Sequence, residues 1–245
     1  MTDRTLVIPM WNEAARIGDT LQAIADSSLN DSRLRLLLVD DGSGDATIDV
    51  AQRALDELPL NGRVLARPHA GKGASVRAGV LAADAPHIVF TDADLSAPVE
   101  DIEKVFVALD AGHGQVVTGI RDSDLGSPPP PIRRLARRVM RDLVKVLGLT
   151  SVPDTQCGLK GFTRAAGRVI LEPLTTSGFA FDVELLARAE HLGLTIHTES
   201  VGWKHRDGST LRVANDAPAM IIELFKMRST RRSWPSKLEA APGDH

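Results

Sequence analysis

The chain has 245 residues, of which 43% are apolar and 25% are charged, and its formal net charge is −3 at pH 7. This length fits one large α/β domain with a substantial core, and the acidic balance argues against a nucleic-acid-binding protein. The single cysteine, Cys157, excludes an internal disulfide framework and is typical of a reducing compartment, which favours the cytoplasm. Because no apolar run has the length of a secretory leader or a membrane span, we expect any contact with the inner face of a membrane to be peripheral.

Short apolar runs alternate with stretches of helical periodicity over the first half of the chain. The runs lack alternating polar residues, as is typical of strands buried on both faces of a parallel sheet. Strand centres are predicted at residues 6–8, 36–39, 64–66, 88–90 and 116–117, and helices at residues 14–25, 47–58, 74–83 and 99–109. This alternation predicts βαβ units in a Rossmann-like, doubly wound and mostly parallel sheet. Ligands of such sheets bind beyond the carboxyl ends of the strands.

The second half of the chain lacks the regular alternation of strands and helices. Residues 127–131 contain four consecutive prolines, which predict an extended connector because proline is excluded from helix interiors. A basic helix is predicted over residues 132–147. From residue 151 to residue 203 we expect an irregular α+β part of the same domain, with its clearest helix at residues 181–191.

The end of the chain is predicted to form one more helix and a tail. The helix is amphipathic and covers residues 217–227, and residues 228–245 are interpreted as a flexible tail. No internal repeat divides the sequence. We therefore predict a single α/β domain over residues 1–227.

Acidic residues follow two of the predicted strands. Asp40 and Asp41 follow the second strand, and Asp92 and Asp94 follow the fourth. Clustered carboxylates repel each other unless a cation or donor groups lie nearby. An Asp-x-Asp pair at the end of a buried strand offers two hard oxygen ligands near one point, which suits Mg²⁺ or Mn²⁺. The alternative is that these aspartates cap helices, but Ser96 already offers a cap for the helix that follows.

A short glycine-rich segment, residues 71–77, opens the third predicted helix. Small residues at a helix N-terminus let backbone N–H groups approach a phosphate, and Lys72 adds a cation. The segment does not have the spacing of a Walker A loop. No G-x-G-x-x-G motif follows the first strand, which argues against a dehydrogenase.

The predicted basic helix carries cations every four residues. The repeating positions are Arg133, Arg137, Arg141 and Lys145, with Arg134 and Arg138 beside them. Such a face is either solvated or in contact with anionic headgroups, since basic amphipathic helices favour membrane surfaces. The seven histidines show no metal-ligand spacing along the sequence, and Cys157 is interpreted as a small packing residue.

The ordered motifs resemble the inverting family 2 glycosyltransferases of GT-A fold. The first three are Val7-Ile8-Pro9 with Asn12-Glu13, then Asp40-Asp41-Gly42-Ser43, then Asp92-Ala93-Asp94. Four further segments, residues 71–77, 118–121, 154–160 and 179–184, are similar to segments of polyprenyl-phosphate sugar synthases, most of all the dolichyl-phosphate β-glucosyltransferase branch. The resemblance implies a UDP-sugar donor, a polyprenyl phosphate acceptor at a membrane surface, and Mg²⁺ or Mn²⁺.

The resemblance also implies a role for individual residues. The residues that it implies for nucleotide-sugar binding are Pro9, Asn12, Glu13, Asp40, Asp41, Lys72 and Asp92. Asp92 and Asp94 would hold the metal. Arg121 would hold the acceptor phosphate together with Arg133 and Arg134, and the catalytic set would be Asp94, Lys72 and Arg121. On this basis residues 1–120 form the nucleotide-sugar half, and residues 121–227 form the acceptor half.

The sequence departs from the family pattern at two points. The mannosyl branch has a glutamine where this chain has Ser96, which puts a third metal ligand in doubt. Members of the glucosyl branch usually carry a membrane span, which this sequence lacks, and a membrane-protein partner would offer another anchor. The oligomeric state is left open.

The acceptor decides which chemistry the second half must supply. A phosphate oxygen is already anionic and needs positioning by arginines, whereas a hydroxyl acceptor needs a general base. Asp154, Asp182 and Glu184 are the candidate bases. Two alternatives therefore stand beside the leading hypothesis, a soluble transferase with a small hydroxyl acceptor and a non-catalytic nucleotide-sugar binding module. The sugar itself, a hexose or an N-acetylhexosamine, is left open.

Overall fold

The computed structural model of the protein describes residues 3–122, 131–178, 180–203 and 213–234. Within these residues the strands are β1 (Arg4–Met10), β2 (Leu34–Asp40), β3 (Gly62–Ala66), β4 (His87–Phe90), β5 (Val116–Arg121), β6 (Lys160–Thr163) and β7 (Ile196–Val201). The helices are α1 (Ile17–Ala25), α2 (Thr47–Glu57), α3 (Lys72–Ala82), α4 (Val99–Asp110), α5 (Pro131–Val146), α6 (Arg164–Leu171), α7 (Phe181–His191) and α8 (Val213–Thr230). A 3₁₀ turn, η1 (Arg231–Ser233), follows α8. All five predicted strand centres lie inside β1 to β5.

The strands form one mixed sheet in the order β3-β2-β1-β4-β6-β5-β7. Every described pairing is parallel except those of β6, which runs antiparallel to both β4 and β5. This confirms the predicted mostly parallel α/β sheet. Because β6 runs the other way, its first residue, Lys160, pairs with Phe90 at the end of β4. The start of β6 therefore lies at the same sheet edge as the carboxyl ends of its neighbours.

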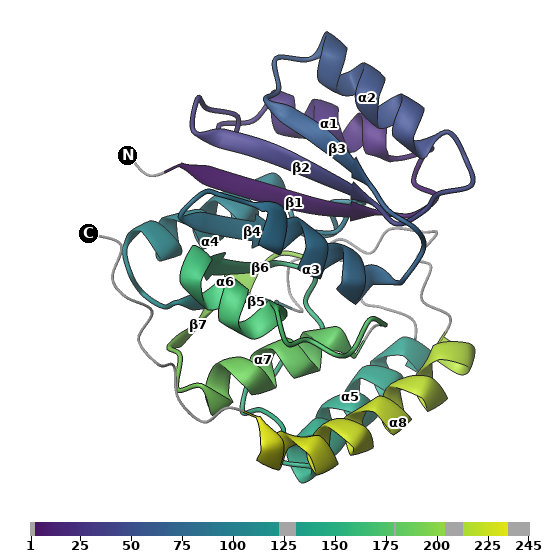
Figure 1. The fold of residues 1–245 in the computed structure, drawn as a ribbon, viewed down its shortest axis with the longest axis vertical. Helices are drawn as coiled ribbons and strands as arrows, with labels where there is room; N and C mark the ends of the chain where they lie inside the picture. The colour runs from purple at the N-terminus through teal and green to yellow at the C-terminus, as the bar shows by residue number, and fades with distance from the viewer. Residues whose placement is uncertain (1–2, 123–130, 179, 204–212, 235–245) are drawn as a thin grey trace.

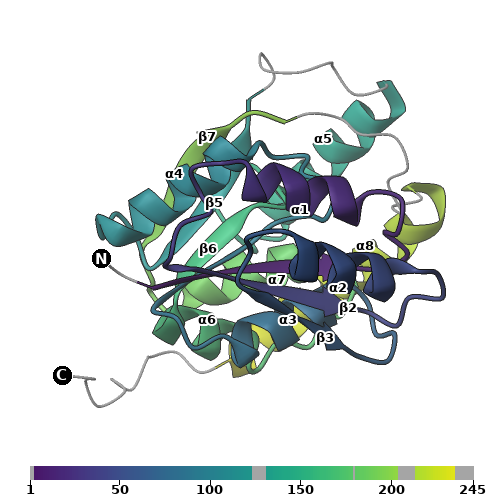
Figure 2. The same ribbon diagram turned by 90° about the horizontal axis from the view of Figure 1, so that it is seen from above.

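Helices cover both faces of the sheet. The core on one face joins Leu6 and Ile8 of β1 to apolar side chains of α1, α2 and α4. Val7 of β1 belongs to the core of the other face, with side chains of α3, α6 and α7. Figure 2 shows α1 and α4 on one side of the strands and α3 and α6 on the other. Burial on both faces explains why these strands are continuous apolar runs.

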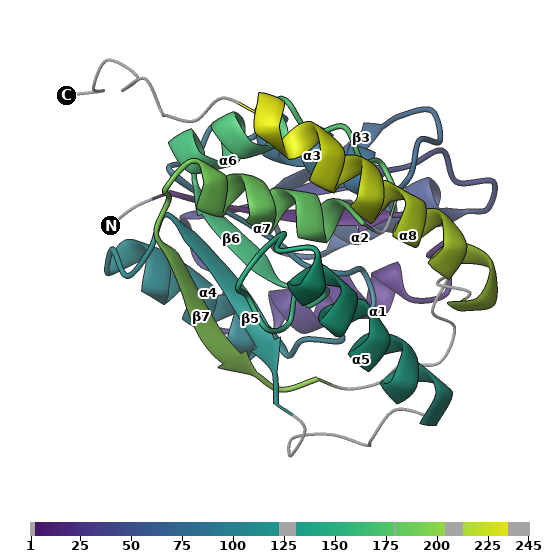
Figure 3. The ribbon, with the colours of Figure 1, turned by 90° about the horizontal axis from the view of Figure 1, so that it is seen from below.

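A further layer lies outside α7 and consists of α5 and α8 (Figures 1 and 3). Met140 and Val144 of α5 share a buried cluster with Val183 of α7 and Leu224 of α8. The predicted basic helix is confirmed as α5, one residue displaced from its expected bounds. Pro131 is its first residue, a position where proline's missing N–H costs nothing. The remaining prolines of the predicted connector lie outside the described residues.

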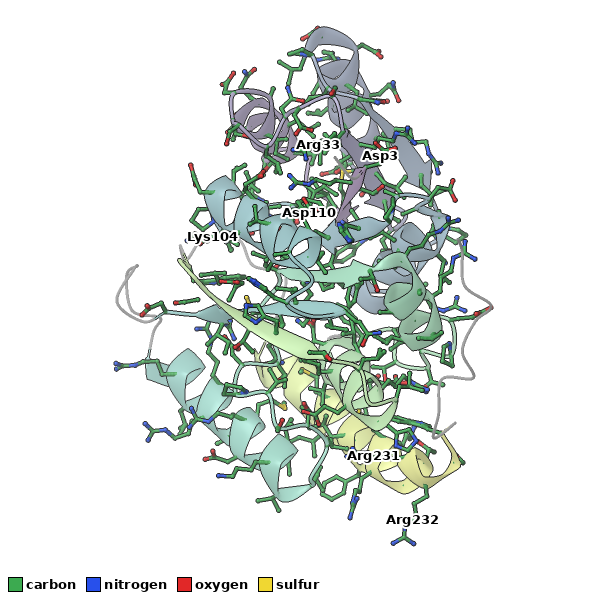
Figure 4. All side chains as sticks on the ribbon, turned by 90° about the vertical axis from the view of Figure 1, so that its left-hand side faces the viewer. Asp3, Arg33, Lys104, Asp110, Arg231 and Arg232 are labelled. Carbon is green, nitrogen blue, oxygen red and sulfur yellow. The ribbon has the colours of Figure 1, made fainter. Side chains whose placement is uncertain are left out.

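Helix α8 ends beyond residue 227, where the sequence analysis placed the end of the last helix. The helix continues to Thr230, and Trp234 beyond it is buried against α7, where Arg188 lies 4.2 Å from the centre of its ring. Arg231 donates to the carbonyl of Leu149 at 3.0 Å, while Arg232 points away from the molecule (Figure 4). This packing extends the helix past Met227. Residues 235–245 of the predicted tail lie outside the described residues.

Candidate active site

The carboxyl ends of β1 and β4 and the start of α3 bring four predicted side chains together. Lys72 Nζ lies 2.5 Å from Asp92 Oδ1, and the charge of Asp94 also acts on Lys72. Glu13 interacts electrostatically with Asp94 and Asp92. Burial and these neighbouring carboxylates raise the pKa of Glu13 above its usual value, although Arg16 opposes the shift. The site therefore concentrates negative charge around one lysine.

A tight turn holds Asp92 and Asp94 next to each other. The backbone N–H of Leu95 donates to the carbonyl of Asp92 at 3.1 Å, and that of Ser96 donates to Asp94 Oδ1 at 2.9 Å. Leu95 has a left-handed backbone, with φ 47°, which is costly for a branched residue. Its buried side chain offsets that cost by packing in the core.

The donor set of this turn fits a small divalent cation. Two carboxylates, both only partly buried, are typical of Mg²⁺ or Mn²⁺ sites that share the ion with substrate phosphates. The expected helix cap is not formed, because α4 begins after Pro98 without a side-chain cap from Ser96. Asp92 and Asp94 do not cap α4 either. Capping therefore does not explain the Asp-x-Asp pair.

Two glycines fix the position of Lys72. Gly71 has φ 100°, and a Cβ there would lie 2.6 Å from the carbonyl oxygen of Ser177. The N–H of Gly73 donates to that same carbonyl at 2.8 Å. Close backbone contact on both sides of Lys72 thus docks the start of α3 onto the loop before α7. Helix α3 begins at Lys72, two residues earlier than predicted.

The environment of Lys72 keeps its ammonium group charged. Burial by itself lowers the pKa of Lys72, but the carboxylates of Asp92 and Asp182 outweigh burial, so the pKa is raised. The lysine also stands at the N-terminus of α3, where backbone N–H groups attract anions. This end of the helix can therefore bind a phosphate group.

The side chain of Asp41 holds the segment around Lys72, residues 70–75, in place. Its Oδ1 accepts hydrogen bonds from the N–H of Ala70 at 3.0 Å and from Ser75 Oγ at 2.9 Å, and its Oδ2 accepts one from the N–H of Gly71 at 2.8 Å. Beside it, the rings of Trp11 and His69 stack with centroids 4.8 Å apart. The structure thus gives Asp41 a part in shaping the site.

The loops after β1 and β2 are tied to each other. Asp40 accepts hydrogen bonds from the N–H groups of Gly42 and Ser43, and Asn12 Oδ1 accepts one from the N–H of Gly44 at 2.9 Å. Arg16 donates to Glu13 Oε2 at 2.7 Å. Pro9 lies in β1, one residue before its end. These residues lie at the carboxyl ends of β1 and β2, as predicted.

Arg121 at the end of β5 has a carboxylate partner. Its guanidinium donates to both oxygens of Asp154, at 2.7 and 2.6 Å, and lies over the ring of Trp203. Burial by itself raises the pKa of Asp154, but the hydrogen bonds and charge of Arg121 hold it below the usual value. A phosphate bound at this position would share the Arg121 guanidinium with Asp154. Arg134 is exposed on α5, and the side chain of Arg133 lies outside the described part of the structure.

Lys160 is a site residue to which the sequence analysis assigned no role. It is fully buried, and its Nζ lies 2.6 Å from Asp182 Oδ1 and donates to the carbonyl of Cys157 at 2.6 Å. Its carboxylate partner, Asp182, interacts electrostatically with Lys72 and Asp92. Two ion pairs therefore stand side by side, one from α3 and β4 and one from β6 and α7. The signal in the sequence was a lone lysine in an otherwise apolar and glycine segment, Leu159-Lys160-Gly161-Phe162.

The three candidate bases have different surroundings. Asp154 is held by Arg121, and Glu184 accepts hydrogen bonds from Thr175, Thr176 and Arg188. Burial raises the pKa of Glu184, but those hydrogen bonds outweigh it and lower the pKa. Burial raises the pKa of Asp182, although Lys160 and Lys72 oppose the shift. Of the three, Asp182 alone has a raised pKa.

Comparison with known proteins places these features in a family. Residues 5–170 match the model of glycosyl transferase family 2. The dolichyl-phosphate β-glucosyltransferase of Dictyostelium discoideum is 28% identical over 239 residues, which cover 91% of this chain and 73% of that protein. The dolichyl-phosphate β-glucosyltransferase of Saccharomyces cerevisiae is 31% identical over an alignment of 252 residues. The alignment covers 91% of this chain and 73% of that protein.

Solved structures show the same fold. Glucosyl-3-phosphoglycerate synthase from Mycobacterium tuberculosis, in complex with Mn²⁺, UDP and glucosyl-3-phosphoglycerate, superposes with a TM-score of 0.70. The superposition covers 96% of this chain and 81% of that one, at 22% sequence identity. This likeness confirms the predicted GT-A fold.

Proposed function

The chain belongs to glycosyltransferase family 2, in the dolichyl-phosphate β-glucosyltransferase branch, and from that premise we propose that it transfers a hexose or N-acetylhexosamine from a UDP-sugar to a polyprenyl phosphate with inversion. Family membership makes it a glycosyltransferase, which sets aside the non-catalytic binding module. The observation that carries the proposal is the Lys72–Asp92 ion pair beside Asp94 at the start of α3. The acceptor class is inferred from the names of the relatives.

On the donor side, the diphosphate would lie at the N-terminus of α3. Lys72 would hold it there and stabilise the charge that UDP gains as the bond to the sugar breaks. Asp92 and Asp94 would hold Mg²⁺ or Mn²⁺, which when bound supplies further positive charge to the leaving diphosphate. Glu13 adds negative charge that such a cation would balance.

The nucleoside would lie against the loops after β1 and β2. Pro9, Asn12, Glu13, Asp40 and Asp41 belong to those loops or to the strand ends that carry them. Asp40, Asn12 and Asp41 accept hydrogen bonds from the backbone N–H groups of residues 42, 44 and 70, and these bonds support a preformed wall for the nucleoside. On this reading residues 1–120 form the nucleotide-sugar half of a single domain, and residues 121–227 form the acceptor half.

On the acceptor side, the outer surface of α5 supports contact with a lipid surface. One flank of the helix is basic and exposed, and consists of Arg134, Arg138, Arg141 and Lys145. The neighbouring flank carries Leu135, Val139 and Val146, each more than half exposed, with the exposed Asp142 among them. A helix with a buried face, a basic flank and an exposed apolar flank is typical of the membrane interface.

The exposed surface of α8 adds to this apolar surface. Ile222 and Phe225 are each more than half exposed. Arg137 is half-buried, so the basic flank differs by one residue from the expected four-residue repeat. Within the described residues, no helix is both long enough and apolar enough to cross a bilayer. We therefore propose peripheral binding at the cytoplasmic face of a membrane, with the anionic lipids there as counterions.

Transfer to a phosphate needs positioning more than proton removal. The phosphate oxygen is already a nucleophile, and its repulsion from the donor diphosphate is the obstacle. Arg121, with Arg133 and Arg134, would hold the acceptor phosphate against that repulsion. Asp154 would keep the Arg121 guanidinium in place before the acceptor arrives.

A second candidate function is transfer to a small hydroxyl acceptor. Asp182 is the candidate base for it, because burial raises the pKa of this carboxyl above its usual value. Against it, Asp182 is buried and already paired with Lys160. The two functions share the donor site and differ in the acceptor.

Product analysis with labelled donors separates these candidates. The purified protein is incubated with UDP-glucose, UDP-N-acetylgalactosamine or GDP-mannose carrying a radiolabelled sugar, together with either a short polyprenyl phosphate or glycerol derivatives. We expect the label to enter the organic phase with a UDP-sugar and the polyprenyl phosphate. Label found in a water-soluble glycoside, with none in lipid, would instead establish the hydroxyl acceptor. Calorimetry with UDP and GDP in the presence of metal tests the donor separately, and UDP should bind more tightly.

A further inference from the structure

We propose that His113, His197 and Glu199 form a second metal site, which takes Zn²⁺ or a similar nitrogen-preferring divalent ion. One ligand atom from each residue lies within 4.8 Å of the other two. The three residues come from the loop between α4 and β5 and from β7, which is the last strand of the sheet order. None of them belongs to the proposed donor or acceptor site.

The strand β7 supplies two of the ligands. His197 and Glu199 are two residues apart, so their side chains lie on the same face of the strand. His197 Nε2 lies 2.8 Å from Glu199 Oε1. The ring of His113 lies 5.1 Å, centre to centre, from the ring of His197. The two histidines and the carboxylate therefore already face one another.

The backbone that carries His113 is fixed. The N–H of His113 donates to the carbonyl of Ala108 at 3.0 Å, and Gln115 and Thr195 exchange hydrogen bonds at 3.0 and 3.2 Å. At Gly114 a Cβ would lie 2.9–3.0 Å from the backbone of Val116, Thr195 and His197, so glycine is needed for this close approach. Only side-chain rotation is then required to bring the ligand atoms together.

The ligand atoms, which lie within 4.8 Å of one another, must come closer by about 1.5 Å at most. With Zn–N distances of about 2.0–2.1 Å and tetrahedral angles, ligand atoms lie about 3.3 Å apart. The His197–Glu199 distance must open slightly and His113, which is exposed, must approach by a rotamer adjustment. Water would complete the four-coordinate shell.

The donor set also distinguishes this site from the Asp92–Asp94 turn. Two imidazoles with one carboxylate favour Zn²⁺ over Mg²⁺ and Mn²⁺, which prefer oxygen ligands. His113 and His197 lie near the amino ends of β5 and β7, whereas Arg121 ends β5 at the proposed acceptor site. A bound ion would cross-link β7 to the loop before β5 and so stabilise an edge strand.

Zinc titration of the full, tag-free chain tests the proposal. Calorimetry is carried out with saturating Mg²⁺ present, so that oxygen-ligand sites do not compete. We expect wild type to bind one Zn²⁺ at this site and His197→Ala and His113→Ala to bind it at least tenfold more weakly. His87→Gln, which changes a histidine outside the cluster, is the control and should bind as wild type does.

Thermal unfolding gives a second readout that does not depend on activity. A ligand that binds only the folded state raises the melting temperature. Zn²⁺ should therefore raise the melting temperature of wild type and of His87→Gln by more than that of His113→Ala. Since His113 is exposed, its replacement leaves the core intact, and the comparison remains valid if His197→Ala is unstable. The proposal is overturned if wild type does not bind Zn²⁺, or if His113→Ala binds it as tightly as wild type.

Discussion

The proposed donor and acceptor regions of the molecule hold their charges in different ways. Before residue 120, Asp40 and Asp41 accept hydrogen bonds from backbone N–H groups of neighbouring loops, and Asp92 pairs with the partly exposed Lys72. After it, Lys160 and Asp182 pair as buried side chains, while Arg134, Arg138, Arg141 and Lys145 of α5 remain exposed. Backbone donors and buried pairs fix single atoms, whereas an exposed flank acts through the number of its charges. Substitutions in the two regions should therefore fail in different ways.

The largest effect is expected at Asp94. Asp94→Asn keeps the shape of the side chain and removes its charge, so turnover should fall roughly 100-fold or more, the scale for losing one preorganised electrostatic group. Melting temperature should stay close to wild type. Transfer assays with and without EDTA provide the measurement, and Asp49→Asn, on the exposed face of α2, is the control. Full activity after exhaustive chelation would show that no metal is used.

The buried pair of the acceptor region should matter most for stability. Lys160→Met leaves the Asp182 carboxylate buried without its partner, which costs roughly 3–5 kcal/mol of unfolding free energy. Arg164→Met breaks an ion pair with Asp84 in which both side chains are exposed, and should cost about 1 kcal/mol or less. Urea unfolding of both variants gives the comparison. Equal losses would contradict the distinction between buried and exposed pairs.

The cations on the basic flank of α5 should make additive contributions to the binding of anionic membranes. Replacing Arg138, Arg141 and Lys145 by glutamine removes three cations, each worth about 1 kcal/mol near an anionic surface. Binding to anionic liposomes should weaken about 100-fold at low salt, and UDP affinity should not change. Sedimentation with liposomes measures the first and calorimetry the second. If the variant sediments as wild type does, the flank is an ordinary solvated surface.

Arg121 should show a smaller and more specific defect. Arg121→Lys keeps a positive charge but loses the bidentate hydrogen bonding that a guanidinium offers to Asp154 and to a phosphate. We expect the KM for a short, soluble polyprenyl phosphate to rise about tenfold, the scale of one hydrogen bond to a charged group, with UDP affinity retained. Steady-state kinetics test this. An unchanged KM would place the acceptor phosphate elsewhere.

The smallest effect is expected from a single methyl group beside Asp92. A Cβ at Gly158 would overlap the Asp92 carboxylate, whereas one at Gly44 would meet open space. Gly158→Ala should therefore weaken UDP binding in the presence of metal several-fold to tenfold, because the Asp92 carboxylate must shift from its present position beside Lys72. Gly44→Ala is the matched control. Calorimetry that finds the two variants equal would show that the position of Asp92 does not matter for binding.

Prediction from sequence succeeded where a strand has a run of apolar residues at its centre. The centres of β1 to β5 and the helices between them follow from apolar runs and helical periodicity. Strands β6 and β7 were not predicted as separate elements. Residues 160–163 of β6 contain a lysine and a glycine, and residues 196–201 of β7 mix polar with apolar residues. Neither segment carries the apolar run by which β1 to β5 were predicted.

The sequence by itself determined the alternation of strands and helices, and with it the sheet edge at which Glu13, Asp41, Asp92 and Lys72 would meet. Local periodicity suffices for this, because the carboxyl ends of parallel strands necessarily share one edge. Only the tertiary structure decided which charges pair. The pairing of Lys160 with Asp182 depends on the reversed direction of β6, and Arg121 and Asp154 are 33 residues apart in the chain. The contact between the rings of His113 and His197 depends on the close approach of β7 at Gly114. Such contacts join segments distant in the chain, and no local pattern in the sequence encodes them.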